Sequence, residues 1–144
     1  MLGAAVLGLE LRLGTPASHR PALRVRERAE KLSARSGARI SWSEDPVEAV
    51  RGARFVYTDT WTSMGQEEEA EQRRRLFQPY QVNHELLSHT SNAYVLHCLP
   101  AHRGEEVTAE VLDGPRSLIY DQAENRLHAQ NAILEHLLGR SIRA

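Results

Sequence analysis

The sequence has few of the features that mark secreted and membrane proteins. It contains one cysteine, Cys98, which excludes an intramolecular disulfide and points to a reducing cytoplasm. No apolar run approaches the roughly 20 residues that a membrane-spanning helix needs. The apolar start, residues 1–13, lacks a basic beginning and a convincing small-residue cleavage site, so we expect no signal peptide. We therefore expect a cytoplasmic protein without a membrane partner.

Motifs for nucleotides, metals and nucleic acids are also missing. Lys and Arg number 18 against 19 Asp and Glu, a balance that gives no support for a nucleic-acid surface. GxGxxG, GxxxxGK[ST] and HExxH do not occur, and no two of the 7 histidines are spaced i,i+4. We expect no cofactor and no metal site. With 144 residues, 41% hydrophobic and 26% charged, the chain fits one globular domain.

What the sequence does have is an alternation of short apolar runs with helical patterns. This alternation predicts an α/β fold of βαβ units, with an open parallel sheet and helices on both faces, as in Rossmann-like proteins. The expected strands are residues 9–13, 39–42, 55–58, 93–97 and 117–120. The expected helices are residues 22–36, 66–80, 83–88 and 105–112, and a long last helix with Leu127, Ile133, Leu134, Leu137 and Leu138 on one stripe.

The N-terminal segment predicts that the sheet lacks its first strand. Residues 1–8 are rich in Ala, Leu and Gly, resemble the second half of a helix, and run straight into a strand. A full βαβ unit takes roughly 30 residues or more, and the first strand of a doubly wound sheet is usually central. Without it, neighbouring strands lose hydrogen-bond partners. We therefore expect residues 1–144 to be an N-terminally incomplete domain, the C-terminal part of a longer enzyme.

The first polar segment after an apolar run is residues 59–65. Asp59 offers a carboxylate to a ligand ammonium group at the end of a strand. Ser63, Met64 and Gly65 precede a helix, whose free N–H groups suit a carboxylate. This pairing predicts a site for the α-ammonium and α-carboxylate groups of an amino acid. The alternative is that Asp59 and Ser63 only cap the helix.

The second segment is His97-Cys98-Leu99-Pro100. Pro100 biases Leu99 towards an extended conformation, which leaves strand-end carbonyl groups free to accept from an amine or a carbamoyl NH2. The Cys98 thiol is a candidate general base if its pKa is lowered. The alternative is that Cys98 is a small buried hydrophobic residue.

The third segment, residues 121–126, ends in Arg126. We expect Arg126 in the first turn of the last helix, where the dipole disfavours a cation unless an anion or a carbonyl oxygen faces it. A guanidinium group suits phosphate. The alternatives are a solvated surface arginine or an ion pair with Glu124. Because the carboxyl ends of parallel strands meet at one edge, the three segments predict a shared pocket.

Together the three segments resemble ornithine carbamoyltransferases. The matching stretches, in the expected order, are residues 59–65, 97–108 and 123–130. The resemblance implies transfer of a carbamoyl group from carbamoyl phosphate to the δ-amine of ornithine, which gives citrulline and phosphate. It also implies a protein of two α/β domains that usually assembles as a homotrimer, with ornithine and carbamoyl phosphate as its small-molecule partners.

The resemblance assigns roles to individual residues. Asp59, Ser63 and Met64 are expected to bind ornithine. Cys98 is expected to lie beside the reacting amine as proton acceptor. Cys98, Leu99 and Arg126 are expected to contact carbamoyl phosphate, and Arg126 is expected to stabilise charge on the tetrahedral centre. Cys98 and Arg126 are thus the predicted catalytic residues.

The departures from the family pattern are large. The Ser-Thr-Arg-Thr phosphate loop and the His-Pro-x-Gln segment are absent, and both belong to the family's carbamoyl-phosphate domain. The chain therefore holds about half of an active site, and we expect no turnover by residues 1–144 alone. Two alternatives stay open. In the first, the acceptor is putrescine or N-acetylornithine in place of ornithine. In the second, the chain is a truncated paralogue that does not catalyse the reaction.

Overall fold

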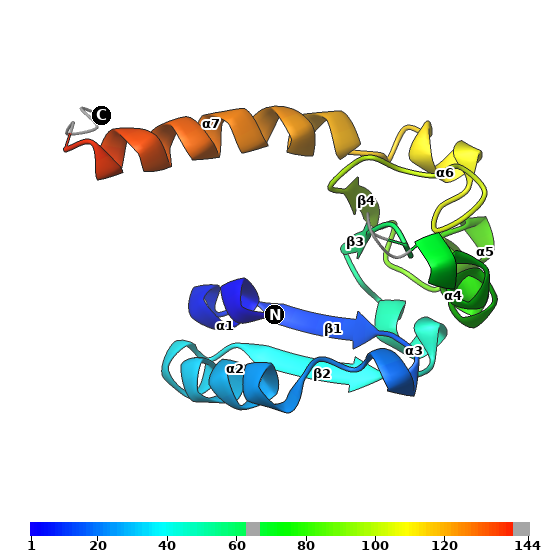
Figure 1. The fold of residues 1–144 in the computed structure, drawn as a ribbon, viewed down its shortest axis with the longest axis horizontal. Helices are drawn as coiled ribbons and strands as arrows, with labels where there is room; N and C mark the ends of the chain where they lie inside the picture. The colour runs from blue at the N-terminus through cyan, green and yellow to red at the C-terminus, as the bar shows by residue number, and fades with distance from the viewer. Residues whose placement is uncertain (63–66, 140–144) are drawn as a thin grey trace.

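The computed structural model describes residues 1–62 and 67–139, which form an α/β fold with two pairs of parallel strands (Figure 1). The strands are β1 (Glu10–Gly14), β2 (Arg39–Ser43), β3 (Phe55–Thr58) and β4 (Tyr94–His97). The helices are α1 (Leu2–Leu7), α2 (Leu23–Ser36), α3 (Pro46–Val50), α4 (Ala70–Phe77), α5 (His84–Ser88), α6 (Ala109–Leu112) and α7 (Ile119–Leu137). Short 3-10 turns occupy Ala17–His19, Glu67–Glu69 and Gln78–Tyr80.

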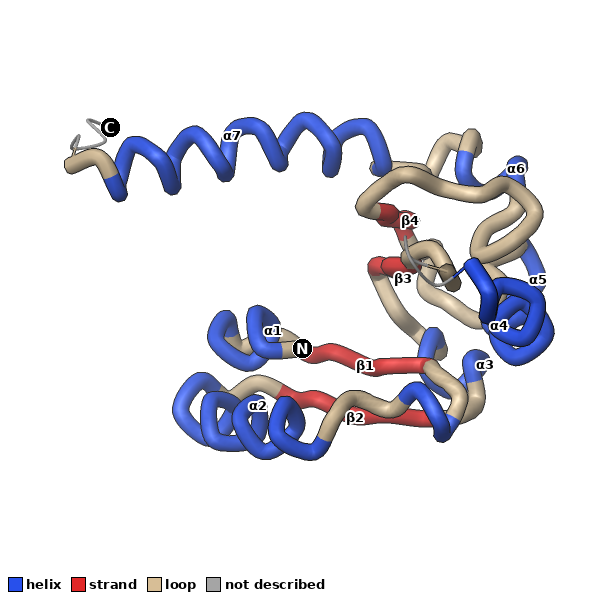
Figure 2. The backbone as a smooth tube through the Cα atoms, in the orientation of Figure 1, coloured by secondary structure: helices blue, strands red, loops and turns tan. Residues whose placement is uncertain are grey.

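Two helices, α1 and α2, pack beside the first strand pair. β1 and β2 run parallel, in a register from Glu10 opposite Arg39 to Gly14 opposite Ser43. α1 and α2 pack on each other and against β2 (Figure 2). α2 ends at Gly37, whose φ of 78° is the left-handed value that favours glycine, as its sequence position predicts. The expected strands 9–13 and 39–42 are confirmed to within one residue.

The second strand pair contains the hydrophobic core. β3 and β4 run parallel, in a register from Phe55 opposite Tyr94 to Thr58 opposite His97. Side chains from both strands, α5, α6 and the start of α7 form one buried cluster, which comprises Val56, Val82, Leu87, Ala93, Val95, Val107, Val111, Leu112 and Ile119. No hydrogen bond joins this pair to β1–β2 within the described residues. The predicted α/β class with parallel strands is therefore confirmed, but its strands form two pairs in place of one sheet.

The expected strand at residues 117–120 is wrong. Only Ser117 bridges to Val95, through Val95 N–H donating to the Arg116 carbonyl and Leu118 N–H donating to the Val95 carbonyl, both at 2.9 Å. From Ile119 the chain is already helical. The good helix formers that follow it outweigh the short apolar run Leu118-Ile119-Tyr120.

Two predicted helices are also shorter than expected. The helix expected over 105–112 is reduced to α6, because Val107 is held in bridges with Val82 and Arg103. The helix expected over 66–80 is α4 flanked by 3-10 turns, and its expected first residue, Gln66, lies outside the described residues. The expected helices 22–36 and 83–88 are confirmed, with Ala22 and Asn83 as their N-caps.

The last helix, α7, extends away from the strands (Figure 1). Its predicted apolar stripe is exposed, from 55% at Leu134 to 77% at Leu138, which follows the helix. The stripe is thus uncovered by the part of the chain that the structure describes. None of the described helices is both long and apolar enough to cross a lipid bilayer.

Candidate functional site

Two of the three predicted polar segments meet at the carboxyl ends of β3 and β4. Thr58 is opposite His97 in the parallel register, so the next residue on each strand, Asp59 and Cys98, lie side by side. The Cys98 thiol donates a hydrogen bond to Asp59 Oδ1 at 3.0 Å. The same oxygen accepts from Thr60 N–H at 2.7 Å, which orients the carboxylate. Asp59 itself is exposed, so its other oxygen is open to a ligand.

The surroundings of Cys98 favour its protonated form. Burial raises the pKa of the Cys98 thiol, and the hydrogen bond to Asp59 and the charge of Asp59 raise it further. The thiol therefore acts as a donor in this arrangement. The general-base role expected for Cys98 requires a lowered pKa, a condition that this arrangement does not meet.

The turn after Cys98 differs from the extended conformation that Pro100 predicts for Leu99. Leu99 has a φ of 58°, in the left-handed region. Its N–H donates to His97 Nδ1 at 2.9 Å, so a local side-chain acceptor outweighs the preference before proline. The carbonyl groups of Cys98 and Leu99 accept no hydrogen bond from the residues that the structure describes. Both are available to a donor such as an amine or an amide NH2.

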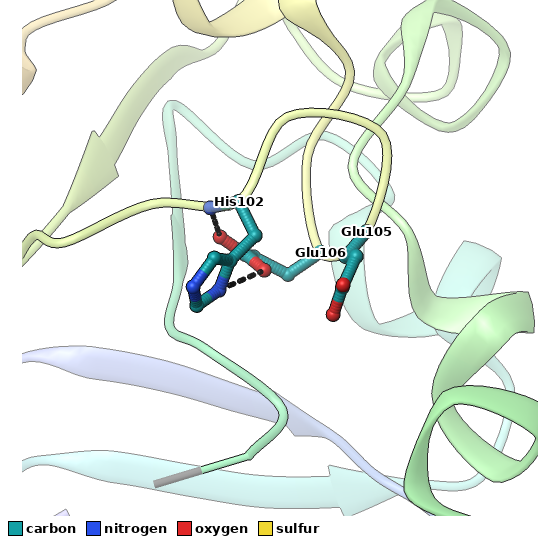
Figure 3. Close-up of side chains that lie close together, drawn as sticks. All are labelled: His102, Glu105 and Glu106. Atoms are coloured by element: carbon teal, nitrogen blue, oxygen red, sulfur yellow. Dashed lines mark hydrogen bonds and ion pairs between the residues drawn. The ribbon is translucent and has the colours of Figure 1, made fainter. Parts of the chain in front are cut away.

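A buried glutamate holds this turn in place (Figure 3). Glu106 is 0% exposed, and its Oε1 accepts from His102 N–H at 2.6 Å and lies 3.1 Å from His97 Nε2. Since His97 Nδ1 accepts from Leu99, a neutral His97 ring carries its proton on Nε2 and donates it to Glu106. The Glu106 main-chain carbonyl also accepts from Val82 N–H at 2.8 Å. Glu106 thus ties the loop beside Cys98 to the core.

Sequence reasoning gave Glu106 no role. The sequence contains one indication that Glu106 is buried. It directly precedes an apolar residue, Val107, in a segment that follows a predicted strand ending in His97. A carboxylate in such a segment, once buried, requires hydrogen-bond donors within reach. His97 is one of these donors, and it was already part of the predicted site.

His102, Glu105 and Glu106 each offer an atom that can bind a metal ion, and these atoms lie within 4.8 Å of one another (Figure 3). Glu105 pairs with Arg74 at 3.1 Å, and Glu106 Oε1 accepts from His102 N–H. Glu106 Oε2 is buried, lies 3.8 Å from His102 Nδ1 and has no hydrogen-bond partner among the described residues. We assign the group to loop structure.

The structure does not bring Arg126 to Asp59 and Cys98. α7 begins at Ile119, so Arg126 lies seven residues further on, about 10 Å along the helix axis. The expectation that Arg126 occupies the first turn, and the dipole argument built on it, are therefore wrong. Arg126 is exposed and makes no hydrogen bond or ion pair within residues 1–62 and 67–139. Glu124, its alternative partner, lies 3.5 Å from His128.

Ser63 and Met64, the other expected ornithine contacts, lie outside the described residues. The segment just before them is anchored by aromatic packing. The Trp61 ring stacks on Phe77 with centroids 6.3 Å apart, and Arg73 donates to the Trp61 carbonyl at 3.4 Å. Arg73 is itself held by Glu69 at 3.0 Å. The described residues on both sides of this loop are thus fixed next to Asp59.

Known proteins resemble the chain along almost its whole length. The ornithine carbamoyltransferase of Carboxydothermus hydrogenoformans is 54% identical over 140 residues, which are 96% of this chain and 45% of that protein. The ornithine carbamoyltransferase of Gloeobacter violaceus is 52% identical over the same shares of the two chains. The chain therefore spans a little under half the length of these relatives.

Solved structures agree with the sequence matches. The ornithine carbamoyltransferase of Pyrococcus furiosus superposes with a TM-score of 0.85 at 50% identity, covering 91% of this chain and 42% of that one. An N-acetyl-L-ornithine transcarbamylase superposes with a TM-score of 0.80 at 31% identity, over 93% and 42% of the two chains. A family profile described as aspartate/ornithine carbamoyltransferase, Asp/Orn binding domain, matches residues 1–137. The chain therefore belongs to the aspartate/ornithine carbamoyltransferase family and corresponds to its Asp/Orn-binding domain.

Proposed function

We propose that the chain is the ornithine-binding half of a carbamoyltransferase that transfers the carbamoyl group of carbamoyl phosphate to the δ-amine of L-ornithine. The observation that carries the proposal is the contact of 3.0 Å between Cys98 and Asp59 at adjacent strand ends. It places an exposed carboxylate and a thiol in one small site. The ornithine carbamoyltransferases at 50–54% identity support ornithine as the acceptor.

The amine substrate itself can reduce the obstacle to base catalysis by Cys98. The thiol pKa is raised first by burial, and then by the hydrogen bond to Asp59 and by the charge of Asp59. An ammonium group of ornithine that pairs with Asp59 replaces the thiol as donor and neutralises that charge. The Cys98 pKa then falls, the thiol releases its proton to solvent, and the resulting thiolate accepts the proton that the attacking δ-amine loses. In this scheme Asp59 binds substrate and sets when Cys98 becomes basic.

The remaining roles are proposed from the family resemblance. Ser63 and Met64 complete the ornithine site, and Leu99 offers its free carbonyl to the carbamoyl NH2. Arg126 contacts the phosphate end of carbamoyl phosphate and stabilises charge on the tetrahedral centre. The other half of the protein supplies the phosphate-binding loop. We place the complete enzyme in the cytoplasm as a homotrimer.

A chimera tests the proposal directly. Residues 1–144 replace the matched segment of the Carboxydothermus hydrogenoformans enzyme, and citrulline formation is measured with ornithine and carbamoyl phosphate. We expect turnover in the chimera and none in the 144-residue chain alone. Putrescine and N-acetylornithine serve as competing acceptors, and a higher kcat/KM for either would reassign the substrate. A folded chimera that is inactive with all three would favour the non-catalytic alternative.

Two variants of the chimera separate the proposed roles. Asp59→Asn is expected to raise KM for ornithine, because it removes the partner of the ammonium group. Cys98→Ala is expected to lower kcat with a smaller change in KM, by roughly the factor of 10² to 10⁴ typical of a lost general base. Glu68→Gln, on the acidic segment before α4, is the matched control and is expected to leave both constants unchanged. Near-normal kcat in Cys98→Ala would remove the catalytic assignment.

A further inference from the structure

The side chains of the β3–β4 pair divide between two faces. Val56, Val95 and His97 are buried on the inner face. Because successive side chains of a strand point to opposite faces, the residues that alternate with them share the outer face. This outer face carries Phe55, Tyr57 and Asp59 from the β3 segment and Tyr94, Leu96 and Cys98 from the β4 segment. The Phe55 and Tyr94 rings, with centroids 6.0 Å apart, meet on it.

Tyr57 lies next to the candidate site on this outer face. It precedes Asp59 by two residues and is opposite Leu96, which precedes Cys98 by two residues. Two residues along a strand span roughly 7 Å, which is about the length of a tyrosine side chain. The Tyr57 hydroxyl can therefore reach the place where the Cys98 thiol contacts Asp59 at 3.0 Å.

The Tyr57 hydroxyl and the Cys98 thiol act on each other. Burial is the largest cause that raises the Cys98 pKa, followed by the hydrogen bond to Asp59, whereas the interaction with the Tyr57 hydroxyl lowers it. Burial, and then the interaction with Cys98, raise the Tyr57 pKa above its usual value. Tyr57 therefore keeps its proton near neutral pH. A protonated hydroxyl beside a thiolate is a hydrogen-bond donor that favours the charged form.

The first turn of α7 contributes Gln122 to this group. Leu118, the N-cap of α7, donates its N–H to the Val95 carbonyl at 2.9 Å, so the helix begins beside β4 (Figure 1). The Gln122 N–H donates in turn to the Leu118 carbonyl at 2.9 Å. The Gln122 side chain interacts with the Tyr57 hydroxyl and lowers the Tyr57 pKa, as an amide N–H donor does.

The other end of the Gln122 amide shows where the hydroxyl proton is free to point. Gln122 Oε1 is buried and has no hydrogen-bond partner among the described residues. It therefore does not take the Tyr57 proton. With the amide N–H on its oxygen, the Tyr57 hydroxyl can direct its own proton to the Cys98 sulfur.

Two titratable side chains thus act on Cys98 in opposite directions. Both come from the β3 segment: Asp59 raises the pKa of the thiol and Tyr57 lowers it. From the elements packed beside them, α7 contributes the uncharged Gln122 and β4 contributes the apolar Leu96. The balance between thiol and thiolate therefore depends on which of the two groups, carboxylate or hydroxyl, is bonded to the sulfur.

We propose that Tyr57 is a positioning residue of the site, whose hydroxyl, held by Gln122, donates to the Cys98 sulfur and stabilises the thiolate. When the ammonium group of ornithine pairs with Asp59, Tyr57 remains as the hydrogen-bond partner of Cys98. Tyr57 thereby favours the basic form of Cys98 without touching the substrate. The effect on the thiol concerns the chain itself, whereas its consequence for turnover rests on the proposed function.

Alkylation of the 144-residue chain tests the effect on the thiol. Cys98 is the only cysteine, so the reaction with iodoacetamide reports on one group. The rate is measured between neutral and alkaline pH for the parent chain and for Tyr57→Phe, and the midpoint of each profile gives the thiol pKa. We expect the midpoint to rise in Tyr57→Phe and the rate near neutral pH to fall by roughly threefold to tenfold, because a donor to the thiolate is lost.

Tyr94→Phe is the matched control. Tyr94 lies on the same outer face, is 45% exposed against 56% for Tyr57, and loses the same hydroxyl. We expect its midpoint to equal that of the parent chain. A substitution that only loosened the site would expose Cys98, and would lower the midpoint by relieving burial. An unchanged or lowered midpoint in Tyr57→Phe, or an equal rise in Tyr94→Phe, would overturn the proposal.

A second variant decides the matter if Tyr57→Phe does not fold, as judged by circular dichroism. Gln122→Met keeps the length of the side chain and removes the amide that holds the hydroxyl. We expect a smaller rise of the midpoint, with alkylation near neutral pH slowed by roughly twofold, because the hydroxyl is less well oriented. An unchanged midpoint in Gln122→Met would then contradict the proposal.

The chimera separates this inference from the proposed function. There Tyr57→Phe is expected to lower kcat near neutral pH by roughly threefold to tenfold, with a loss that shrinks as the pH rises. KM for ornithine should change little, because Asp59 still binds the ammonium group. A raised thiol midpoint in a chimera without turnover would contradict the proposed function alone. An active chimera with an unchanged midpoint, or with an unchanged kcat profile, would contradict the role of Tyr57.

Discussion

The β3–β4 region and the β1–β2 region bury very different amounts of side chain. Around β3 and β4, nine hydrophobic residues form one core cluster, with Val95 at 1% and Leu112 at 2% exposure. In the β1–β2 region, through residue 43, the buried hydrophobic residues are Ala5 and Ala29. The candidate site, Asp59 and Cys98, lies at the ends of β3 and β4, in the region that contains the core cluster. The position of Asp59 and Cys98 is therefore set by local packing, whereas the β1–β2 region buries little apolar side chain of its own.

The difference has a simple structural cause. A two-stranded unit is marginal unless other elements cover it. β4 packs against α7, and side chains of α5 and α6 join those of β3 and β4 in the core cluster, whereas β1 and β2 contact α1, α2 and α3. Leu11 and Leu13 on β1 line a cavity of about 1180 Å³ between β1 and β3, and they stay partly exposed. The two regions should therefore respond differently to matched substitutions.

The largest difference is expected from truncation in the core. Leu112→Ala removes a side chain that is 2% exposed, and should lower the free energy of unfolding by about 2–5 kcal/mol. Leu23→Ala, at a helix position that is 59% exposed in the β1–β2 region, should change it by less than about 0.5 kcal/mol. Urea denaturation of both variants measures the two values. Similar losses in the two variants would contradict the comparison.

The next effect concerns the buried carboxylate. Glu106→Gln keeps the shape of the side chain but removes the charge that accepts from His97 and the His102 amide. We expect a loss of about 1–3 kcal/mol, the cost of an imperfectly satisfied buried group. The neighbouring Glu105→Gln, which loses only a partly exposed pair with Arg74, is the control and should cost less. A smaller loss in Glu106→Gln than in Glu105→Gln would remove Glu106 as the anchor of the loop.

The features that the sequence predicted correctly are those that depend on local patterns. Strong local patterns were sufficient for the four strands β1 to β4 and for α2 with its terminal Gly37. The neighbouring strand ends then placed Asp59 beside Cys98 without knowledge of tertiary contacts. For these features, hydrophobic periodicity and the rule that ligands bind at the carboxyl ends of parallel strands are sufficient.

The remaining features depend on contacts that a linear pattern does not contain. The run Leu118-Ile119-Tyr120 reads as a strand, yet only one bridge forms and α7 begins at Ile119, which displaces Arg126 from the predicted helix start. The left-handed Leu99 depends on the His97 ring as acceptor. The burial of Glu106 depends on His97 and the loop at His102.

A smaller effect is expected at the site itself. Asp59→Asn removes the charge that raises the Cys98 pKa, so the thiolate fraction at a given pH increases. Alkylation by iodoacetamide at pH 8 should therefore be faster in Asp59→Asn than in the parent chain. Asp45→Asn, which alters the cap of α3 and is far along the chain from Cys98, is the matched control. An unchanged rate in Asp59→Asn would show that burial alone sets the thiol pKa.

The raised Cys98 pKa also has a consequence for stability. The folded state keeps the thiol proton at a pH where the unfolded chain, with a thiol pKa of about 8.5, has lost it. Stability should therefore fall as the pH rises above that value. Cys98→Ser should flatten this decline, as measured by thermal melts between neutral and alkaline pH. A decline that is equally steep in Cys98→Ser would assign it to other groups.

The smallest effects are expected at exposed ion pairs, and here the two regions should not differ. Arg103 holds Asp113 through two hydrogen bonds of 2.9 and 2.8 Å and lowers the Asp113 pKa, while Arg39 at 2.7 Å lowers the Glu10 pKa in the other region. A carboxyl group whose pKa is lowered by folding stabilises the fold at a pH above its pKa in the unfolded chain. This contribution is lost as the pH falls through its pKa in the folded protein.

Both pairs are exposed, so salt and solvent screen them. Asp113→Asn and Glu10→Gln should therefore produce similar, slight losses near neutral pH that disappear in acid and in 1 M NaCl. Thermal melts across pH and salt measure both variants. A loss in Asp113→Asn that approached that of Leu112→Ala would mean that surface charge, and not the buried cluster, distinguishes the β3–β4 region. Equal and small losses would leave the core as the feature that holds Asp59 beside Cys98.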